Sequence, residues 1–493
     1  MKLSTSLVGA TAAALFSVQT AADGLSISSD SDIKATAETV AKRLLRFYKG
    51  DEEGAIPGIL PGPPAAGAGD YYWWSASAVW ASLVDYWHFT GDGAHNDVVM
   101  RALLFQAGDG GDYMPANQTA AMGNDDQGFW GIAAMTAAER NFPNPPRDGP
   151  QWLGLAQRVF RDLAGRWDAE TCGGGLRWQI LSMNKGWDYK NGKSFIPVLT
   201  NKAASAGVLM NLGARLSRYT GNSTFGDWSD KVWDWAEHTG LINNGTVYDG
   251  AHPSDNCSDI SKIEFSYNSG LFALGAACML NTTGDTKWKD RLDSVVSHGL
   301  EVFFKDGGAA REVACETVGG GGGRCTSDMT FFKGIYVQML AAAAQVSPHI
   351  AETVLPALNR SAAAAVRSCG SSANDDACGL DWTTGGKAAD GKGNAGSTCS
   401  VLSSVVSLLA GAGDAPYTAK TGATSSGGNG GNSGSSSGGD GGGGGGGSRP
   451  SASTGGSGGG GGSGGGDKKG AAGKTSGSIT LGLMMTCIAI LLL

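Results

Sequence analysis

The chain has 493 residues and a formal net charge of −8, and 81 of its residues are glycine. Residues 421–478 hold 28 of these glycines and no aromatic residue, whereas all 14 tryptophans lie between Trp73 and Trp382. An acidic chain is a poor partner for nucleic acid or anionic lipid, and the glycine-rich stretch has too little apolar surface to form a core.

The first 22 residues have the pattern of a secretory signal. Lys2 precedes an apolar run over residues 7–18, and small residues follow as far as Ala22. This is the arrangement of a signal peptide that is removed from the mature protein. We therefore expect a signal peptide over 1–22 and a secreted protein.

Residues 23–420 are expected to form one domain that is helical almost throughout. Apolar residues recur there at intervals of three and four, which places them on one face of an α-helix. The predicted helices cover residues 31–50, 79–87, 95–106, 126–140, 151–167, 202–219, 228–239, 268–281, 288–304, 329–346, 350–367 and 399–411.

A short repeated phrase suggests how these helices are arranged. Gly91, Gly221 and Gly284 each follow a threonine at the end of a predicted helix and precede Asp or Asn. Glycine commonly ends a helix in the left-handed conformation. The separations of 130 and 63 residues fit units of about 64 residues, the length of a helical hairpin with its loops. Six hairpins would fill the domain and predict an all-α (α/α)6 toroid, whose inner helix ends line a central cleft. A generic helical bundle or solenoid is the alternative.

Two adjacent aspartates carry the clearest chemical signal. Asn124 is placed to cap a helix whose first turn contains Asp125 and Asp126. Two carboxyl groups about 5 to 5.5 Å apart are what retaining glycoside hydrolysis needs. The alternative is that acidic residues occupy a first turn simply because they suit the helix dipole. A second pair, Asp375 and Asp376, lies among small polar residues and is expected to be a solvated loop.

Other kinds of catalytic site find little support in the sequence. The six histidines form no metal-binding spacing, and neither a serine-hydrolase nor a nucleotide-binding motif is present. We therefore expect no metal and no cofactor.

Four motifs resemble glycoside hydrolase family 76. They are Tyr72-Trp-Trp-Ser-Ala, Gly123-Asn-Asp-Asp-Gln-Gly-Phe-Trp-Gly, Phe265-Ser-Tyr-Asn-Ser-Gly and Phe331-Phe-Lys-Gly, and the resemblance runs over about residues 31–410. Within the family, the chain looks like the fungal cell-wall group named for defective filamentous growth and defective cell wall. The resemblance implies an (α/α)6 catalytic domain and retaining endo-α-1,6-mannosidase activity, with Asp125 as nucleophile and Asp126 as general acid/base.

For the fungal group, the resemblance also implies transglycosylation. The mannose core of a glycosylphosphatidylinositol (GPI) anchor would be cleaved, and the attached glycoprotein would be passed to cell-wall β-glucan. A covalent mannosyl-enzyme can be resolved by a sugar hydroxyl as well as by water, so the same site serves both outcomes. The alternatives are a wall lectin or adhesin without turnover, and a structural wall protein.

Further sugar contacts are expected from residues in or near these motifs. Aromatic rings pack on the C–H faces of sugars, and polar side chains bind their hydroxyl groups. These residues are Trp74, Gln127, Trp130, Trp187, Asp249, Tyr267, Asn268 and Lys333. The alternative for each is a structural role, such as a buried ring, a helix cap or a turn.

The C-terminal end predicts a tether followed by an anchor signal. Residues 421–478 read as a disordered Gly/Ser-rich linker that contains an attachment site between Gly464 and Ala472, and residues 479–493 form a terminal apolar tail. This is the pattern of a GPI signal whose tail is removed, with a tail-anchored or single-span protein as the alternative. We expect a monomer on the outer face of the plasma membrane, in the cell wall, or in both.

The cysteines and glycosylation sequons also indicate export. Cys487 lies in the apolar tail, and the remaining eight cysteines are an even number that suits disulfides. Cys315 with Cys325 and Cys369 with Cys378 are each spaced to close a Gly-rich loop. N-glycosylation is expected at the sequons of Asn117, Asn222, Asn244, Asn256, Asn281 and Asn359.

Overall fold

The computed structural model describes residues 25–64, 67–184, 187, 205–304, 308–316, 325–370, 378–383 and 393–427. Within these ranges the chain forms twelve α-helices, several short 3-10 turns and one small sheet. The predicted signal peptide, the apolar tail, the GPI attachment region and the Asp375–Asp376 pair lie outside the described residues.

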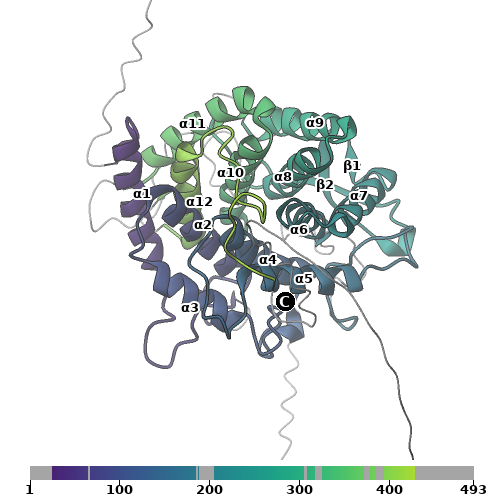
Figure 1. Ribbon diagram of the computed structural model, residues 1–493, viewed down its shortest axis with the longest axis horizontal. Helices are drawn as coiled ribbons and strands as arrows, with labels where there is room; N and C mark the ends of the chain where they lie inside the picture. The colour runs from purple at the N-terminus through teal and green to yellow at the C-terminus, as the bar shows by residue number, and fades with distance from the viewer. Residues whose placement is uncertain are drawn as a thin grey trace, which may run out of the picture. The chain divides into compact units, whose positions relative to one another are not determined.

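Six helices form a closed inner ring. They are α2 (Ser75–Thr90), α4 (Asn124–Glu139), α6 (Ser205–Thr220), α8 (Ser266–Thr283), α10 (Met329–Val346) and α12 (Ala395–Val406). Each packs against the next, and α12 returns to pack against α2 (Figure 1). The ring is the predicted toroid, and its closure excludes an open solenoid.

Six further helices pack around the outside of the ring. They are α1 (Asp30–Leu45), α3 (Asn96–Gln106), α5 (Trp152–Gly165), α7 (Ser223–His238), α9 (Thr286–Phe303) and α11 (Ala351–Arg367). Burial separates the two layers: every residue of α12 is buried, whereas α5 buries seven of its fourteen residues along one face. An amphipathic helix belongs on the outside and an apolar one on the inside.

The helices observed agree with the twelve predicted stretches, with ends that differ by a few residues. The predicted stops are also confirmed: Gly91, Gly221 and Gly284 have φ values of 78°, 73° and 68°. These glycines follow α2, α6 and α8, so the repeated phrase marks the ends of inner helices.

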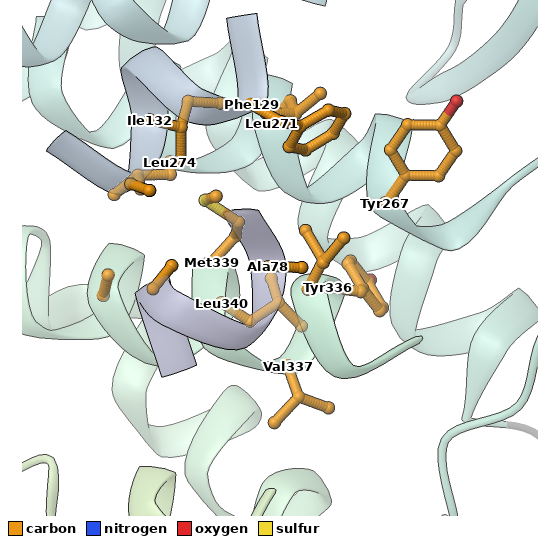
Figure 2. Close-up of a cluster of buried hydrophobic side chains, with 14 of the residues drawn as sticks. Ala78, Phe129, Ile132, Tyr267, Leu271, Leu274, Tyr336, Val337, Met339 and Leu340 are labelled. Atoms are coloured by element: carbon orange, nitrogen blue, oxygen red, sulfur yellow. The ribbon is translucent and has the colours of Figure 1, made fainter. Parts of the chain in front are cut away.

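The core lies on the axis of the ring, where α2, α4, α8 and α10 meet. Figure 2 shows apolar side chains from these helices converging there. They include Ala78, Phe129, Ile132, Leu271, Leu274, Met339 and Leu340, all buried. The axis is therefore filled with side chains, and any cleft is restricted to the ends of the helices.

A small antiparallel sheet between α7 and α8 was not expected from the sequence. Its strands are β1 (Ile242–Asn243), β2 (Thr246–Ala251) and β3 (Ile260–Glu264), in the order β1-β2-β3. The register shifts between Tyr248 and Gly250, where β3 has one residue more than β2. Three strands this short have no recognisable periodicity, so the sequence does not predict the sheet.

The described domain continues to residue 427, past the expected start of the linker at 421. Tyr417 N–H donates to the Glu139 carbonyl at 2.8 Å, and Ala419 N–H donates to the Tyr219 carbonyl at 2.9 Å. Further on, the Tyr219 hydroxyl donates to the Ser425 carbonyl at 3.0 Å, and Leu153 N–H donates to Ser425 Oγ at 3.1 Å. Residues 417–425 thus close over the far ends of α4 and α6 because polar groups on the domain pair with their backbone.

Three disulfides join segments of the described domain. Cys315–Cys325 and Cys369–Cys378 confirm the two predicted loop closures, and Cys172–Cys257 links positions 85 residues apart. Cys278 on α8 and Cys399 on α12 remain buried thiols. None of the helices within the described ranges has the length and apolar character needed to cross a bilayer.

Candidate active site

Asp125 and Asp126 lie in the first turn of α4, as predicted. Asp125 is buried and Asp126 half-buried, and Gly123 N–H donates to Asp126 Oδ2 at 2.6 Å. A Cβ placed on Gly123 would lie 2.3 Å from Asp125 Oδ1 and 3.2 Å from Asp126 Oδ2. Two points at these distances from a common point are at most 5.5 Å apart, so the two carboxylate oxygens lie within that separation. This upper limit is compatible with the separation of about 5 to 5.5 Å between the carboxyl groups of retaining glycosidases.

The start of α4 is held by a segment that follows α5. Asn124 N–H donates to the Trp178 carbonyl at 2.7 Å, and Ile180 N–H donates to the Met122 carbonyl at 3.2 Å. Gly123 and Gln179 form an isolated antiparallel bridge between these bonds. The backbone that carries the aspartates is therefore fixed on both sides, which a catalytic pair needs in order to keep its geometry.

Asn124 does not cap α4, contrary to expectation. It is the first helical residue, its Nδ2 donates to the Arg177 carbonyl at 2.9 Å, and its Oδ1 accepts a hydrogen bond from Arg166. The Asp126 carboxylate instead accepts the Gly123 N–H at the helix start. The capping function thus belongs to one of the two aspartates.

Gln127, one of the predicted sugar contacts, is wholly buried and fully hydrogen-bonded. Its Nε2 donates to the Asp112 carbonyl at 2.7 Å and to Asp162 at 3.2 Å, and its Oε1 accepts from Arg166 at 2.5 Å. Burial lowers the pKa of Arg166 and raises the pKa of Asp162. Gln127 is therefore a support for the first turn of α4.

Two other predicted sugar contacts, Trp130 and Lys333, have side chains that lie in the core. Trp130 is wholly buried, and its ring stacks on Trp73 and Tyr113 with centroids 5.1 and 5.4 Å away. Lys333 is wholly buried, and its Nζ lies 2.9 Å from Glu316 and 4.0 Å from the centroid of the Trp382 ring.

Trp74 and Tyr267 both pack against Phe129 and Phe332. The Trp74 ring lies 5.1 Å from Phe129, and Phe129 lies 5.9 Å from Tyr267. Tyr267 in turn packs 4.1 Å from Phe332, and Trp74 Nε1 donates to Asp328 Oδ1 at 2.9 Å. These residues come from the N-terminal ends of α2, α4, α8 and α10, so those ends converge close to the aspartates. In Figure 2 the Tyr267 hydroxyl points away from the apolar cluster.

Asn268 is the predicted binding residue with the most unusual surroundings. Its side chain is only 1% exposed, and neither its Oδ1 nor its Nδ2 has a hydrogen-bond partner among the described residues. A buried amide that makes no hydrogen bond costs about 1 to 3 kcal/mol. A ligand hydroxyl would remove that cost.

Asp249 and Trp187 have different surroundings. Asp249 is buried on β2, where the register with β3 shifts. The Arg177 guanidinium stacks 4.8 Å from the Trp187 ring centroid. Trp187 also lines a cavity of about 300 Å³ together with Asn124, Arg166, Asp168, Arg177 and Gln179. The first turn of α4 thus borders an open space with one aromatic wall.

Two residues that support the site, Trp178 and Glu312, are not predicted from the sequence. Trp178 Nε1 lies 2.8 Å from the Cβ position on Gly123, which places the indole beside both aspartates. Glu312, wholly buried, accepts hydrogen bonds from Ser266 N–H and Ser266 Oγ at the start of α8, next to Tyr267. Both reach the site through contacts far apart in the sequence, and neither lies in a motif that marks it.

The remaining polar groups add two observations. Within the described ranges, no group of three or more His, Cys, Asp or Glu side chains is placed to hold a metal ion. All six sequon asparagines are exposed, and their glycosylation stays a prediction: Asn117, Asn222, Asn244, Asn256, Asn281 and Asn359.

Comparison with known proteins agrees with this fold. The sequence pattern of Glycosyl hydrolase family 76 matches residues 32–420. The chain is 42% identical over 389 residues to mannan endo-1,6-alpha-mannosidase DCW1 of Saccharomyces cerevisiae, covering 78% of this chain and 81% of that protein. It is 36% identical over 386 residues to DFG5 of the same yeast, which has the same enzyme name, covering 78% and 79%.

Solved structures give the same answer for the fold. The crystal structure of Dfg5 from Chaetomium thermophilum, in complex with glucosamine, is 45% identical with a TM-score of 0.76 and covers 82% of this chain and 96% of that one. The GH76A α-1,6-mannanase from Salegentibacter sp. HEL1_6 is 18% identical with a TM-score of 0.58, covering 76% and 98%. The chain belongs to glycosyl hydrolase family 76.

Proposed function

We propose that this glycoside hydrolase is a retaining, endo-acting α-1,6-mannosidase and transglycosidase of the fungal cell wall. Its substrate is α-1,6-mannan or the mannose core of a GPI anchor. One observation carries the proposal: the Asp125 and Asp126 carboxylates lie within 5.5 Å of each other at the start of an inner helix. Relatives that are 33% to 42% identical bear the name mannan endo-1,6-alpha-mannosidase.

In the first step, the Asp125 carboxylate attacks the anomeric carbon of a mannose residue. The glycosidic C–O bond breaks, Asp126 gives its proton to the departing oxygen, and a mannosyl ester forms on Asp125. Burial of Asp125 limits the water around the nucleophile, and the greater exposure of Asp126 leaves it accessible to the leaving group. In the second step, Asp126 takes a proton from the acceptor hydroxyl, which attacks the same carbon and releases Asp125.

The acceptor decides between hydrolysis and transfer. Water gives a shortened mannan, whereas a hydroxyl of cell-wall β-glucan gives a glycoprotein attached to the wall. The predicted signal peptide, Gly/Ser-rich linker and GPI signal support the transfer reaction, because an enzyme that carries them would lie beside both sugars. The Dfg5 relative was solved with glucosamine, a sugar distinct from mannose.

A distant relative supports the roles of the aspartates. An inactive variant of the Salegentibacter GH76A enzyme, in which two consecutive aspartates are replaced by asparagine, was solved with α-1,6-mannotriose. Here Asp125 and Asp126 are the consecutive pair in the first turn of α4. We assign the sugar-facing positions around them to Trp74, Trp187, Asp249, Tyr267 and Asn268.

The test uses single substitutions of the pair. Asp125→Asn and Asp126→Asn should each lower the rate of α-1,6-mannan cleavage at least about 10³-fold, with unchanged helical circular dichroism. Glu52→Gln with Glu53→Gln is a matched control, because these two adjacent acids lie in an exposed turn well before Asp125 in the sequence. Full activity in either aspartate variant would refute the assignment.

A second measurement separates an enzyme from a lectin. A 2-fluoro-mannosyl fluoride should leave a covalent mannosyl adduct, and mass spectrometry of peptides should place it on Asp125. Labelled mannan offered together with a β-glucan acceptor then shows whether the sugar is released or transferred. Sugar binding without an adduct or product would favour the lectin.

A further inference from the structure

A groove of about 1000 Å³ lies beside α5, separate from the aspartates. Its walls are the connection between α4 and α5, the first three turns of α5, and residues 424–427. The 16-residue α4 is about 24 Å long, and the connection follows the end opposite Asp125. The proposed mechanism makes no use of this groove.

The groove is basic although the chain is acidic. Three arginines line it, Arg147, Arg158 and Arg161, against one acid, Asp148. Arg158 lies 3.6 Å from Asp162 and 4.0 Å from Asp112, so these two acids neutralise it, and the positive charge of the groove comes from Arg147 and Arg161. Arg147 and Arg161 form no ion pair with any residue that the structure describes. In a chain with a net charge of −8, this local excess of positive charge stands out.

The walls of the groove are fixed by the fold. Prolines at 143, 145, 146 and 150 stiffen the connection, and Gln151 Nε2 donates to the Pro146 carbonyl at 2.9 Å. Across the groove, Asn144 Nδ2 donates to the Thr424 carbonyl at 3.1 Å. The arginines are therefore mounted on a preorganised frame, which lowers the entropy cost of binding a ligand.

We infer that this groove is a second glycan-binding site that recognises a phosphate ester carried by a sugar chain. The planar guanidinium groups of Arg147 and Arg161 match the geometry of phosphate oxygens. The side-chain amides and exposed backbone of the Pro/Gly-rich wall suit sugar hydroxyl groups. The volume admits more than an isolated phosphate. The site would hold a phosphorylated polymer while the ring acts on an unphosphorylated stretch.

The experiment compares two ligands in the full chain carrying Asp125→Asn, so that the sugar is not consumed. Calorimetry would measure the affinity for an oligomannoside with one phosphodiester-linked mannose and for the same oligomannoside without it. The phosphorylated ligand should bind about tenfold more tightly at low salt, since charged hydrogen bonds contribute about 1.5 kcal/mol or more. Arg147→Ala with Arg161→Ala should abolish this difference.

Arg101→Ala with Arg367→Ala serves as the control, because both are exposed arginines on outer helices outside the groove. This variant should keep the tenfold preference. Equal affinity for the two ligands, or a preference that survives in the groove variant, would overturn the inference. So would tighter binding to phosphatidylinositol vesicles than to the phosphorylated glycan, or equally tight binding of inorganic phosphate. Hydrolysis of unphosphorylated mannan by the groove variant in the otherwise native chain should be unchanged, which tests the catalytic assignment separately.

Discussion

Lys333 and Glu316 form an ion pair 2.9 Å long in which the lysine is wholly inaccessible to solvent. Burial raises the pKa of Glu316 and lowers the pKa of Lys333, and each partner opposes the shift of the other. The pair lies between the two short disulfide loops, where Lys333 also donates to the Leu380 carbonyl. A lysine in a family-like motif is thus a structural element of the domain.

Breaking this pair should destabilise the protein more than removing it. Lys333→Met leaves Glu316 buried without its cation and should lower the free energy of unfolding by about 3 to 5 kcal/mol. Lys333→Met combined with Glu316→Gln should recover most of that loss. Urea denaturation of the two single variants and the double variant measures the coupling. Additive losses in the double variant would contradict the pairing.

Gly123→Ala should inactivate the enzyme without unfolding it. The added methyl group would lie 2.3 Å from Asp125 Oδ1 and 2.8 Å from Trp178 Nε1, so the carboxylate must move. A displacement of about 1 Å is expected to lower kcat about 10²-fold. Gly165→Ala is the control, because a Cβ at that helix end has no atom within 4 Å. Equal activity in both variants would show that the first turn tolerates the shift.

Asn268→Leu should make the protein more stable and less active. Replacing a buried amide that has no partner among the described residues removes a desolvation cost, so the melting temperature should stay equal or rise. If the amide binds a substrate hydroxyl, KM for α-1,6-mannan should rise about tenfold with a smaller change in kcat. Thermal denaturation and steady-state kinetics measure the two effects. A loss of stability with unchanged KM would assign Asn268 to the core.

Glu312 should make the stability depend on pH. Burial raises the pKa of its carboxyl to about 8 from an ordinary value of 4.5. Between these values the folded protein keeps a proton that the unfolded chain has lost, so this contribution is complete below pH 4.5 and declines as the pH rises toward 8. The decline is on the order of 1 kcal/mol per pH unit.

Glu312→Gln tests this directly, because the amide oxygen still accepts from Ser266 but does not titrate. The difference in unfolding free energy between the original protein and the variant should change steadily from pH 5 to pH 8. Glu301→Gln, an exposed position on α9, should show no such trend. A constant difference across this range would mean that the folded carboxyl titrates normally.

The C-terminal boundary gives a further test. Ser425 Oγ accepts the N–H of Leu153 near the start of α5, so Ser425→Ala should cost about 1 kcal/mol of stability. A chain that ends at 420 loses this cap and the Tyr219 contact, and its melting temperature should fall further than that of a chain ending at 427. Identical melting curves for the two truncations would place the boundary at 420.

The sequence predicts the ring well because the ring follows from local patterns. Apolar periodicity identifies each helix, and the left-handed glycines such as Gly91 mark where inner helices end. The sequence predicts only part of the site. Asp125 and Asp126 stand out because a helix start gathers them within one turn. The surroundings of Trp130 and Lys333 depend on which faces the closed ring covers, and a single motif contains no information about that.

Contacts between residues that are far apart in the sequence cannot be predicted for the same reason. Trp178 reaches Asp125 only because residues 177–180 pair with the start of α4, more than fifty positions earlier. The strands around Asp249 are too short to have a recognisable period. Neither kind of contact leaves a trace in local spacing.

The hydrogen bonds of residues 417–425 also have a mechanical consequence. A pulling force applied at residue 427 would act first on Ser425, Ala419 and Tyr417, whose partners lie at the ends of α4, α5 and α6 remote from Asp125. These bonds would have to break one after another before tension reached the first turn of α4. Residues 417–425 would therefore protect the first turn of α4 from the pulling force, and the Asp125 and Asp126 carboxylates would keep their spacing.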